Sequence, residues 1–379
     1  MKALTLILAG LVACGGSDVA GDAPSSMIDA PGDTSAPVGC ASRADWLVDE
    51  RFSDAQVTTE NDLVYGTTGM TLDLYVPSAA ADTCTARPML VMVHGGGWVI
   101  GQKEWLETRA RFHARRGMVV ATLDYRKTTQ GALCTSPNPV AAWYRAAQDL
   151  HAALQYLASR SAELKIDPTR VLLYGNSAGA FTTLDLALAS PAEIATSYPQ
   201  LALSEGALDA VSTHKTATYR IAAAASQAGA LFDGGWLKRG PSETPPALFL
   251  LHANGDPTVP FGQAAMTGLC SGRSDLVVCG TGCIRNAIAA DSTLGLCATS
   301  IEVASNIHDL DEVYGERCAS TSPACAASRI DEATSRFFSV VTYGACEPQS
   351  WQCTGTACTL AAGTPTRPLG MFSNAGEWP

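Results

Sequence analysis

The sequence predicts an α/β fold, in which a mostly parallel central sheet carries helices on both faces. Two observations lead to this prediction. Short, wholly apolar runs such as "PMLVMV" (88–93) and "MVVATL" (118–123) have the length and composition of strands that are covered on both sides. Segments with apolar residues at helical spacing separate these runs, as expected for the connections between parallel strands.

The first half of the chain supplies its elements in alternating order. Two period-two segments around a Thr-Thr-Gly turn predict a hairpin over 57–77. After it we expect a buried strand over 88–96, a helix over 104–116 and a second buried strand over 117–126. Three-to-four spacing of apolar residues then predicts a long helix over 139–159, and an Asp-Pro turn leads into a strand over 166–175.

The second half continues the same alternation. We expect strands over 218–230, 245–256 and 299–309, a helix over 260–270 and a last helix over 327–341. One side of the last helix carries its apolar residues, which are Ile330, Ala333, Phe337, Phe338 and Val341.

Domain organisation follows from these elements. The catalytic domain is predicted over 40–345, and within it the weakly patterned segment 191–218 is interpreted as a small cap over the site. Residues 346–379 are rich in Cys, Gly and Thr and are expected to form a disulfide-stapled appendage.

The chain begins with "MKALTLILAGLVACGG", where one Lys precedes a short apolar stretch. This pattern predicts a secretory leader over 1–13 whose end resembles a bacterial lipoprotein box, with Cys14 acylated; an ordinary cleaved leader is the alternative. Residues 14–39 are almost free of large apolar side chains and predict a flexible tether. We expect an exported lipoprotein at the outer membrane or cell surface, because Gly15 and not Asp follows the cysteine.

Cysteine usage agrees with an oxidising compartment. If Cys14 carries lipid, the other 12 of the 13 cysteines form an even set, as disulfides require. Metal ligation is the alternative for the pairs Cys279/Cys283 and Cys353/Cys358, but no His lies near either pair. We therefore expect disulfides, and the sequence leaves their pairing open.

Charge limits the partners of the protein. The net charge of -11 disfavours a nucleic-acid-binding surface and a polybasic membrane patch, because both need clustered Lys and Arg. Membrane contact is expected only through the N-terminal lipid. The oligomeric state is left open.

The motif "GNSAG" holds the candidate nucleophile, Ser177, between the strand "VLLY" and a helical run. Small residues at Gly175 and Gly179 allow the strand and the helix to approach closely, and the serine sits on a strained turn at the carboxyl end of a strand. A plain strand-to-helix loop with a serine cap is the alternative.

A serine hydroxyl needs a histidine to take its proton and a carboxylate to orient that histidine. With the chain order Ser, acid, His, the best base is His308, which follows a late strand. Asp256 is the best acid because it follows the strand "ALFLLHANG", and Asp233 is kept in reserve. His252 is set aside as the base because it precedes the acid.

A developing oxyanion needs fixed donors, and "HGGGW" follows a buried strand about 80 residues before the serine. The candidate donors are the N–H groups of Gly95, Gly96, Gly97 and Ala178. A flexible glycine loop or a phosphate cradle is the alternative.

With "HGGGW", "LDYR", "GNSAG", "HANGDPTVP" and "NIHD", the chain resembles the α/β-hydrolase superfamily over residues 57–341. Within it, the resemblance is to carboxylesterases and lipases related to hormone-sensitive lipase and to the bacterial feruloyl-esterase-like group. The resemblance implies that Ser177, Asp256 and His308 are the catalytic residues, that His94 shapes the glycine loop, and that no metal or organic cofactor takes part. It also implies short-acyl carboxylic esters as substrates.

We therefore expect a serine esterase that hydrolyses short-acyl or aryl esters through an acyl-enzyme. Two alternatives stay open: a serine peptidase or amidase on the same fold, and a non-catalytic cell-surface binding protein on a retired hydrolase fold.

Overall fold

The computed structural model describes residues 47–360, apart from 79, 81–83, 136–137, 238–243, 272, 312–328, 344–345, 347 and 355–356. All of these belong to one unit, 37–379. The predicted leader over 1–13, the acylated Cys14 and the tether over 14–39 lie outside the described residues and stay predictions. None of the described helices is both long and apolar enough to cross a bilayer.

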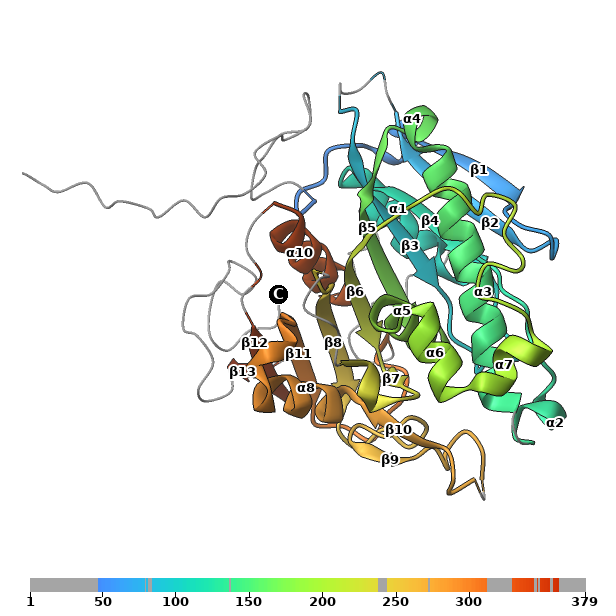
Figure 1. The fold of residues 1–379 in the computed structure, drawn as a ribbon. Coiled ribbons are helices and arrows are strands. Elements are labelled where there is room, and N and C mark those ends of the chain that lie inside the picture. The colour runs from blue at the N-terminus through green and yellow to red at the C-terminus, as the bar shows by residue number, and fades with distance from the viewer. Residues whose placement is uncertain are drawn as a thin grey trace, which may run out of the picture. The chain divides into compact units, whose positions relative to one another are not determined.

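A ten-stranded sheet forms the centre of the unit (Figure 1), in the order β1-β2-β4-β3-β5-β6-β8-β11-β12-β13. The strands from β4 to β12 in this order run parallel, whereas β1 and β2 pair antiparallel with each other, β2 pairs antiparallel with β4, and β13 pairs antiparallel with β12. The strands are β1 (Val57–Val64), β2 (Thr71–Pro77), β3 (Arg87–Val93), β4 (Val119–Leu123), β5 (Ile166–Asn176), β6 (Ile221–Gln227), β8 (Ala247–Ala253), β11 (Ala298–Val303), β12 (Gln349–Thr354) and β13 (Ala357–Leu360).

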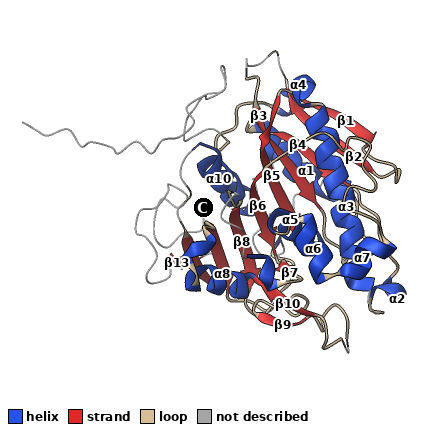
Figure 2. Cartoon of the chain, viewed as in Figure 1, coloured by secondary structure: helices blue, strands red, loops and turns tan. Residues whose placement is uncertain are grey.

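Helices pack on both faces of this sheet (Figure 2). Side chains alternate along β3: Met89 and Val91 join one core with α3 and α5, whereas Leu90 and Met92 join a second core with α1 and α10. Because both faces are covered, β3 is apolar from Pro88 to Val93, as predicted. The helices are α1 (Glu107–Arg115), α2 (Gln130–Leu133), α3 (Asn138–Ser159), α4 (Ser161–Leu164), α5 (Ala178–Leu188), α6 (Pro191–Ser197), α7 (Pro199–Ser204), α8 (Thr281–Ala290) and α10 (Arg329–Tyr343).

The predicted α/β class is confirmed, and so are the hairpin, the long helix α3 and the parallel strands. The apolar side of the last helix is buried as expected, with Ile330, Ala333, Phe337 and Phe338 at most 1% exposed.

The helix predicted over 260–270 is wrong. Gln263–Ala265 form a short strand, β9, which belongs to a second sheet with β7 (Ala230–Leu231) and β10 (Val277–Gly280). Gly262 and Gly268 have low helix propensity, and a Cβ on Gly268 would lie 1.9 Å from the carbonyl oxygen of Pro257. The chain approaches the Pro257 backbone too closely here for a side chain.

Residues 349–360 also differ from the prediction. They were expected in a disulfide-stapled appendage, and disulfides join Cys297 to Cys346 and Cys353 to Cys358, but β12 also pairs in parallel with β11, and β13 forms the edge of the central sheet. The sheet therefore extends past residue 345, and residues 361–379 lie outside the described part of the chain.

Four disulfides have both of their cysteines among the described residues, and they supply that part of the pairing which the sequence left open. Two of them are the pairs for which metal ligation had been the alternative. The disulfides join Cys134 to Cys270, Cys279 to Cys283, Cys297 to Cys346, and Cys353 to Cys358.

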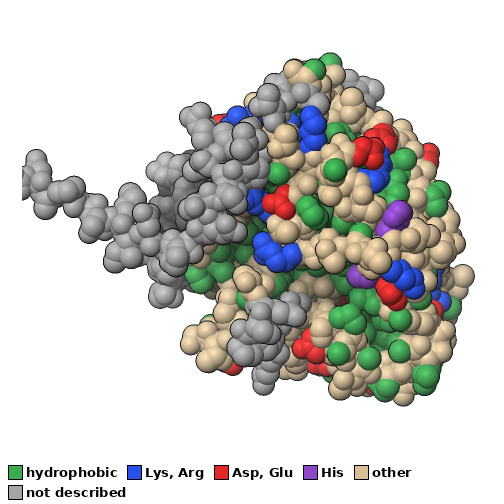
Figure 3. Space-filling model, turned by 45° about the horizontal axis from the view of Figure 1, so that its top comes forward, with side chains coloured by type: hydrophobic (Ala, Val, Ile, Leu, Met, Phe, Trp, Pro, Cys, Tyr) green, Lys and Arg blue, Asp and Glu red, His purple; other side chains and the backbone are tan. Residues whose placement is uncertain are grey.

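Acidic and basic side chains are interspersed on the described part of the face drawn in Figure 3.

Asp185 carries the first testable prediction. It lies in α5 and is fully buried. Its Oδ1 accepts a hydrogen bond from the N–H of Phe232 at 3.4 Å, and the structure gives its Oδ2 no partner among the described residues. Burial raises the pKa of this carboxyl well above 3.8. In the unfolded chain the group ionises near pH 4, so folding takes up a proton above that pH and stability falls as pH rises.

We expect Asp185→Asn to remove this pH dependence. Its free energy of unfolding, relative to the wild type, should increase from pH 5 to pH 8 by at most about 1.4 kcal/mol per pH unit. Urea unfolding of both proteins at four pH values measures the difference. Curves that stay parallel across this range would show that Asp185 is ionised in the folded protein.

Candidate active site

Ser177 lies on the turn between β5 and α5 with φ 51° and ψ -119°. This is a sparsely populated backbone conformation for a residue with a side chain, and it is the strained turn that the motif predicts. The turn is fixed by a hydrogen bond from the N–H of Ser177 to the carbonyl of Gln227 at 2.8 Å. The strain is therefore held by the neighbouring strand, β6.

Two glycines allow this turn. A Cβ on Gly175 would lie 2.3 Å from the carbonyl oxygen of Gly179, and one on Gly179 would lie 2.1 Å from the carbonyl oxygen of Val93. Both obstacles are backbone atoms, which cannot move without shifting β3 or α5. The crowding predicted for these two positions is confirmed.

We expect Gly179→Ala to lower the free energy of unfolding by about 3 kcal/mol, because overpacking against rigid backbone forces the end of β3 away from α5. Chemical denaturation measures the change. Gly262→Ala is the matched control, since a Cβ there meets nothing within 4 Å. Equal stability of the two variants would contradict the close approach of α5 to β3.

The three predicted catalytic side chains meet at one edge of the sheet. Ser177, Asp256 and His308 follow β5, β8 and β11, which run parallel within the order β5-β6-β8-β11. Their carboxyl ends therefore lie at the same edge. His308 Nε2 lies 2.8 Å from Ser177 Oγ, and His308 Nδ1 lies 2.7 Å from Asp256 Oδ2. The structure thus brings together all three residues in hydrogen-bonding order.

Asp256 is held as an ionised carboxylate. Its side chain is fully buried, and its Oδ1 accepts the N–H groups of Thr258 at 2.7 Å and Val259 at 3.0 Å. Burial raises the pKa of Asp256, but the hydrogen bonds from His252 and His308 together lower it by more. The pKa of Asp256 therefore lies well below its usual range. Asp233, the reserve candidate, instead accepts hydrogen bonds from Ser197 Oγ and from the N–H of Gly235.

The glycine loop lies beside the serine. Tyr125 Oη donates to the carbonyls of His94 at 3.1 Å and Gly95 at 3.2 Å, and His94 Nδ1 donates to the Gly95 carbonyl at 2.7 Å. In a trans peptide the N–H points opposite to the carbonyl, so these bonds turn the N–H groups of Gly95 and Gly96 away from Tyr125. The structural role predicted for His94 agrees with this geometry.

Two residues of the glycine loop, Gly96 and Gly97, have positive φ angles. They are 105° at Gly96 and 61° at Gly97, which favour glycine. The N–H of Ala178, at the first position of α5, is the further predicted donor beside Ser177. Tyr125 belongs to the motif "LDYR", from which no role was predicted for this residue.

The chain is similar in sequence to a family model and to known esterases. Residues 72–229 match the BD-FAE family model. A probable isoprenylcysteine alpha-carbonyl methylesterase of Oryza sativa subsp. japonica is 34% identical over 29% of this chain and 23% of its own length. Carboxylesterase NlhH of Mycobacterium tuberculosis is 32% identical over 30% of this chain and 32% of its own length. The matches thus span less than a third of these relatives.

Among solved structures, Thermogutta terrifontis esterase 2 phosphorylated by paraoxon is similar with a TM-score of 0.51, at 17% identity. The similarity covers 77% of this chain and 96% of that chain. The chain has the α/β-hydrolase fold. The strained turn after β5 and the glycine loop after β3 are where this fold places a nucleophile and its oxyanion donors.

A cavity of about 360 Å³ opens over Ser177 in this α/β-hydrolase fold. Among the described residues, none of 191–218 lines it, so that segment forms a layer beside α3 and not a cap over the serine. The lining residues are His94, Gly95, Gly96, Gly97, Trp105, Leu106, Arg109, Asn176, Ser177, Thr258, Leu269, His308, Asp309 and Asp311.

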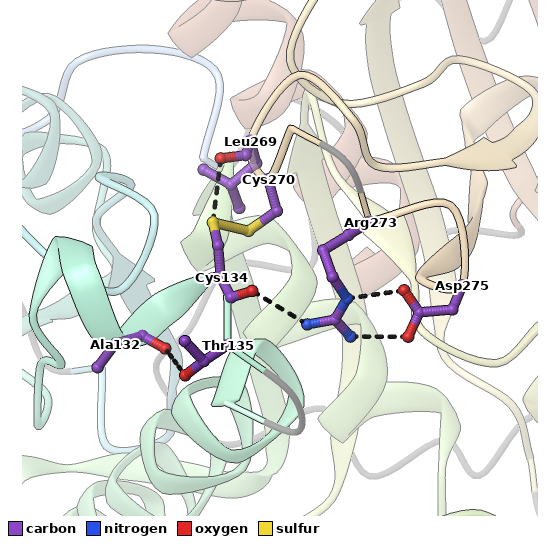
Figure 4. The surroundings of a disulfide bond; sticks show 7 residues. All are labelled: Ala132, Cys134, Thr135, Leu269, Cys270, Arg273 and Asp275. Carbon is purple, nitrogen blue, oxygen red and sulfur yellow. Dashed lines mark hydrogen bonds and ion pairs between the residues drawn. A yellow bond between two sulfur atoms is a disulfide. The ribbon is translucent and has the colours of Figure 1, made fainter.

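Leu269 forms a wall of this cavity, and a disulfide fixes its position. A Cβ on Gly97 would lie 3.3 Å from Leu269 Cδ1, so the leucine packs against the glycine loop. Figure 4 shows the next residue, Cys270, joined to Cys134, whose Sγ lies 3.4 Å from the Leu269 carbonyl oxygen. Arg273 donates to the Cys134 carbonyl at 3.3 Å and pairs with Asp275.

Proposed function

We propose that the protein is a serine hydrolase that cleaves carboxylic esters, with short-acyl or aryl esters as substrates. The single observation that carries the proposal is the chain of hydrogen bonds from Asp256 through His308 to Ser177, with distances of 2.7 and 2.8 Å. The names of the two relatives, a methylesterase and a carboxylesterase, support the same reaction class.

In the proposed mechanism, Ser177 Oγ attacks the ester carbonyl carbon while His308 Nε2 takes the hydroxyl proton. The carboxylate of Asp256 stabilises the imidazolium that forms and keeps the proton of Nδ1 in place. The N–H groups of the glycine loop and of Ala178 stabilise the oxyanion. His308 then protonates the departing alcohol oxygen, and water hydrolyses the acyl-serine by the same steps.

Active-site labelling tests this proposal. We expect a fluorophosphonate to add once to the wild-type protein, and peptide mass spectrometry should place the adduct on Ser177. In parallel, the protein should accelerate the hydrolysis of p-nitrophenyl acetate and leave p-nitroacetanilide at its uncatalysed rate, which separates an esterase from an amidase. An unlabelled protein, or an adduct on another serine, would refute the proposal.

The side chain of Leu269 is expected to limit the size of the substrate group that the cavity accepts. Replacing it by alanine removes the wall beside Gly97, so kcat/KM for p-nitrophenyl butanoate relative to acetate should rise about tenfold. The same measurement on Leu203→Ala is the control, because Leu203 is 88% exposed on α7. Leu269 does not limit the size of the substrate if Leu269→Ala changes neither this ratio nor the relative kcat/KM values for acetate esters of differently sized alcohols.

A further inference from the structure

We propose that His252 is a positioning residue that acts through Asp256 to lower the basicity of His308. This inference rests on the proposed function. His252 is fully buried at the end of β8, and its Nε2 lies 3.1 Å from Asp256 Oδ2. The same oxygen accepts the hydrogen bond from His308 Nδ1 at 2.7 Å. The carboxylate therefore lies between two imidazole rings that share one of its oxygens.

The partners of His252 define where its proton lies. Nε2 faces two acceptors, Asp256 Oδ2 and the carbonyl oxygen of Val259 at 3.2 Å, so this nitrogen carries the hydrogen. Nδ1 lies 3.3 Å from Thr281 Oγ1, whose hydroxyl donates to it. A neutral ring with the proton on Nε2 satisfies every partner, and His252 is thus a donor to Asp256.

This donor changes the chemistry of the base. Asp256 already accepts two backbone N–H groups on Oδ1, so His252 is a fourth donor on the carboxylate. Each donor takes up part of the negative charge that would otherwise stabilise the His308 imidazolium. His252 therefore weakens the stabilisation that Asp256 gives to the imidazolium of His308.

The other groups around this cluster leave the argument unchanged. From α1, Arg109 reaches the cavity, but it is ion-paired with Asp311 and Asp331. Asp309 follows His308 and also lines the cavity. Phe261 packs edge-on against His252, with ring centroids 5.7 Å apart. Asp256 itself accepts hydrogen bonds from His252, His308 and the N–H groups of Thr258 and Val259, so a substitution at position 252 removes one of these donors.

Three variants separate the donor from the shape of the side chain. His252→Phe and His252→Met fill the buried space without an N–H, whereas His252→Gln keeps an amide N–H within reach of Asp256. The first readout is the acid limb of kcat/KM against pH with p-nitrophenyl acetate. The second is the NMR titration of the His308 Cε1–H in the Ser177→Ala background, which needs no activity.

We expect both variants without a donor to move the midpoint of His308 upward by about one pH unit, and His252→Gln to stay close to the wild type. A purely structural role would lower the amount of folded protein and leave the midpoint in place. An unchanged titration midpoint of His308 in His252→Phe and His252→Met, or the same increase in His252→Gln, would overturn the inference. If the wild type cleaves no ester, the proposed function fails, while the titration still tests the link between His252 and His308.

Discussion

Replacing Ser177 by alanine should lower kcat for p-nitrophenyl acetate by on the order of a millionfold. The substitution removes the only protein atom that bonds to the acyl carbon in the proposed mechanism, and His308 then has no serine hydroxyl to activate. Losses of about this size follow when a serine nucleophile is removed from a triad, because the members act as a unit. Stopped assays over hours and circular dichroism together measure the activity and the folded state.

The same substitution at an exposed serine is the matched control for this measurement. Ser204 is exposed on α7, away from the residues that line the cavity, and Ser204→Ala should keep full activity. If Ser177→Ala retained more than a small fraction of the wild-type rate, another nucleophile would be at work.

The second large effect is expected for Asp256→Asn, with a loss of about ten-thousandfold in kcat. The physical reason is that all four hydrogen bonds to this side chain come from donors. His308 and His252 donate to Oδ2, and the N–H groups of Thr258 and Val259 donate to Oδ1. An asparagine must place its NH₂ toward one of these pairs, whichever way the amide is turned, so donors would face donors.

The consequence depends on which pair the amide faces. Toward the histidines, it forces His308 to carry its proton on Nε2, where the ring cannot accept the proton of Ser177. Toward the backbone, it breaks the turn that follows β8. Steady-state kinetics measure the loss, and Asp233→Asn is the control for the reserve acid. A large loss in Asp233→Asn with little loss in Asp256→Asn would reverse the assignment.

Local patterns in the sequence were sufficient to predict the three side chains that meet at the site. Ser177, Asp256 and His308 each follow a run of apolar residues, and buried parallel strands bring their carboxyl ends to one edge of the sheet. Gly175 and Gly179 indicated a close approach of strand and helix. Strand, helix and turn signals are local, so the chain alone was enough to place them.

His252 could have been found from its own position, because a histidine inside the apolar strand "ALFLLHA" needs a buried partner. The sequence did not name that partner. The bond to Asp256 depends on how the turn after β8 folds back over four residues. Tyr125 is similar, since its contacts with the glycine loop depend on β4 lying next to β3 in the sheet.

The sequence by itself determined the strands and helices of the core and the chemical identity of the predicted catalytic groups, because periodicity and small-residue motifs report local geometry. Only the tertiary structure decided the pairing of Cys134 with Cys270, the strand in place of the helix near Gly268, and the second histidine on Asp256. The disulfide joins segments that are distant along the chain, the chain near Gly268 approaches another backbone closely, and the bond between His252 and Asp256 depends on how the turn after β8 folds. Such contacts depend on packing in three dimensions, which no local pattern encodes.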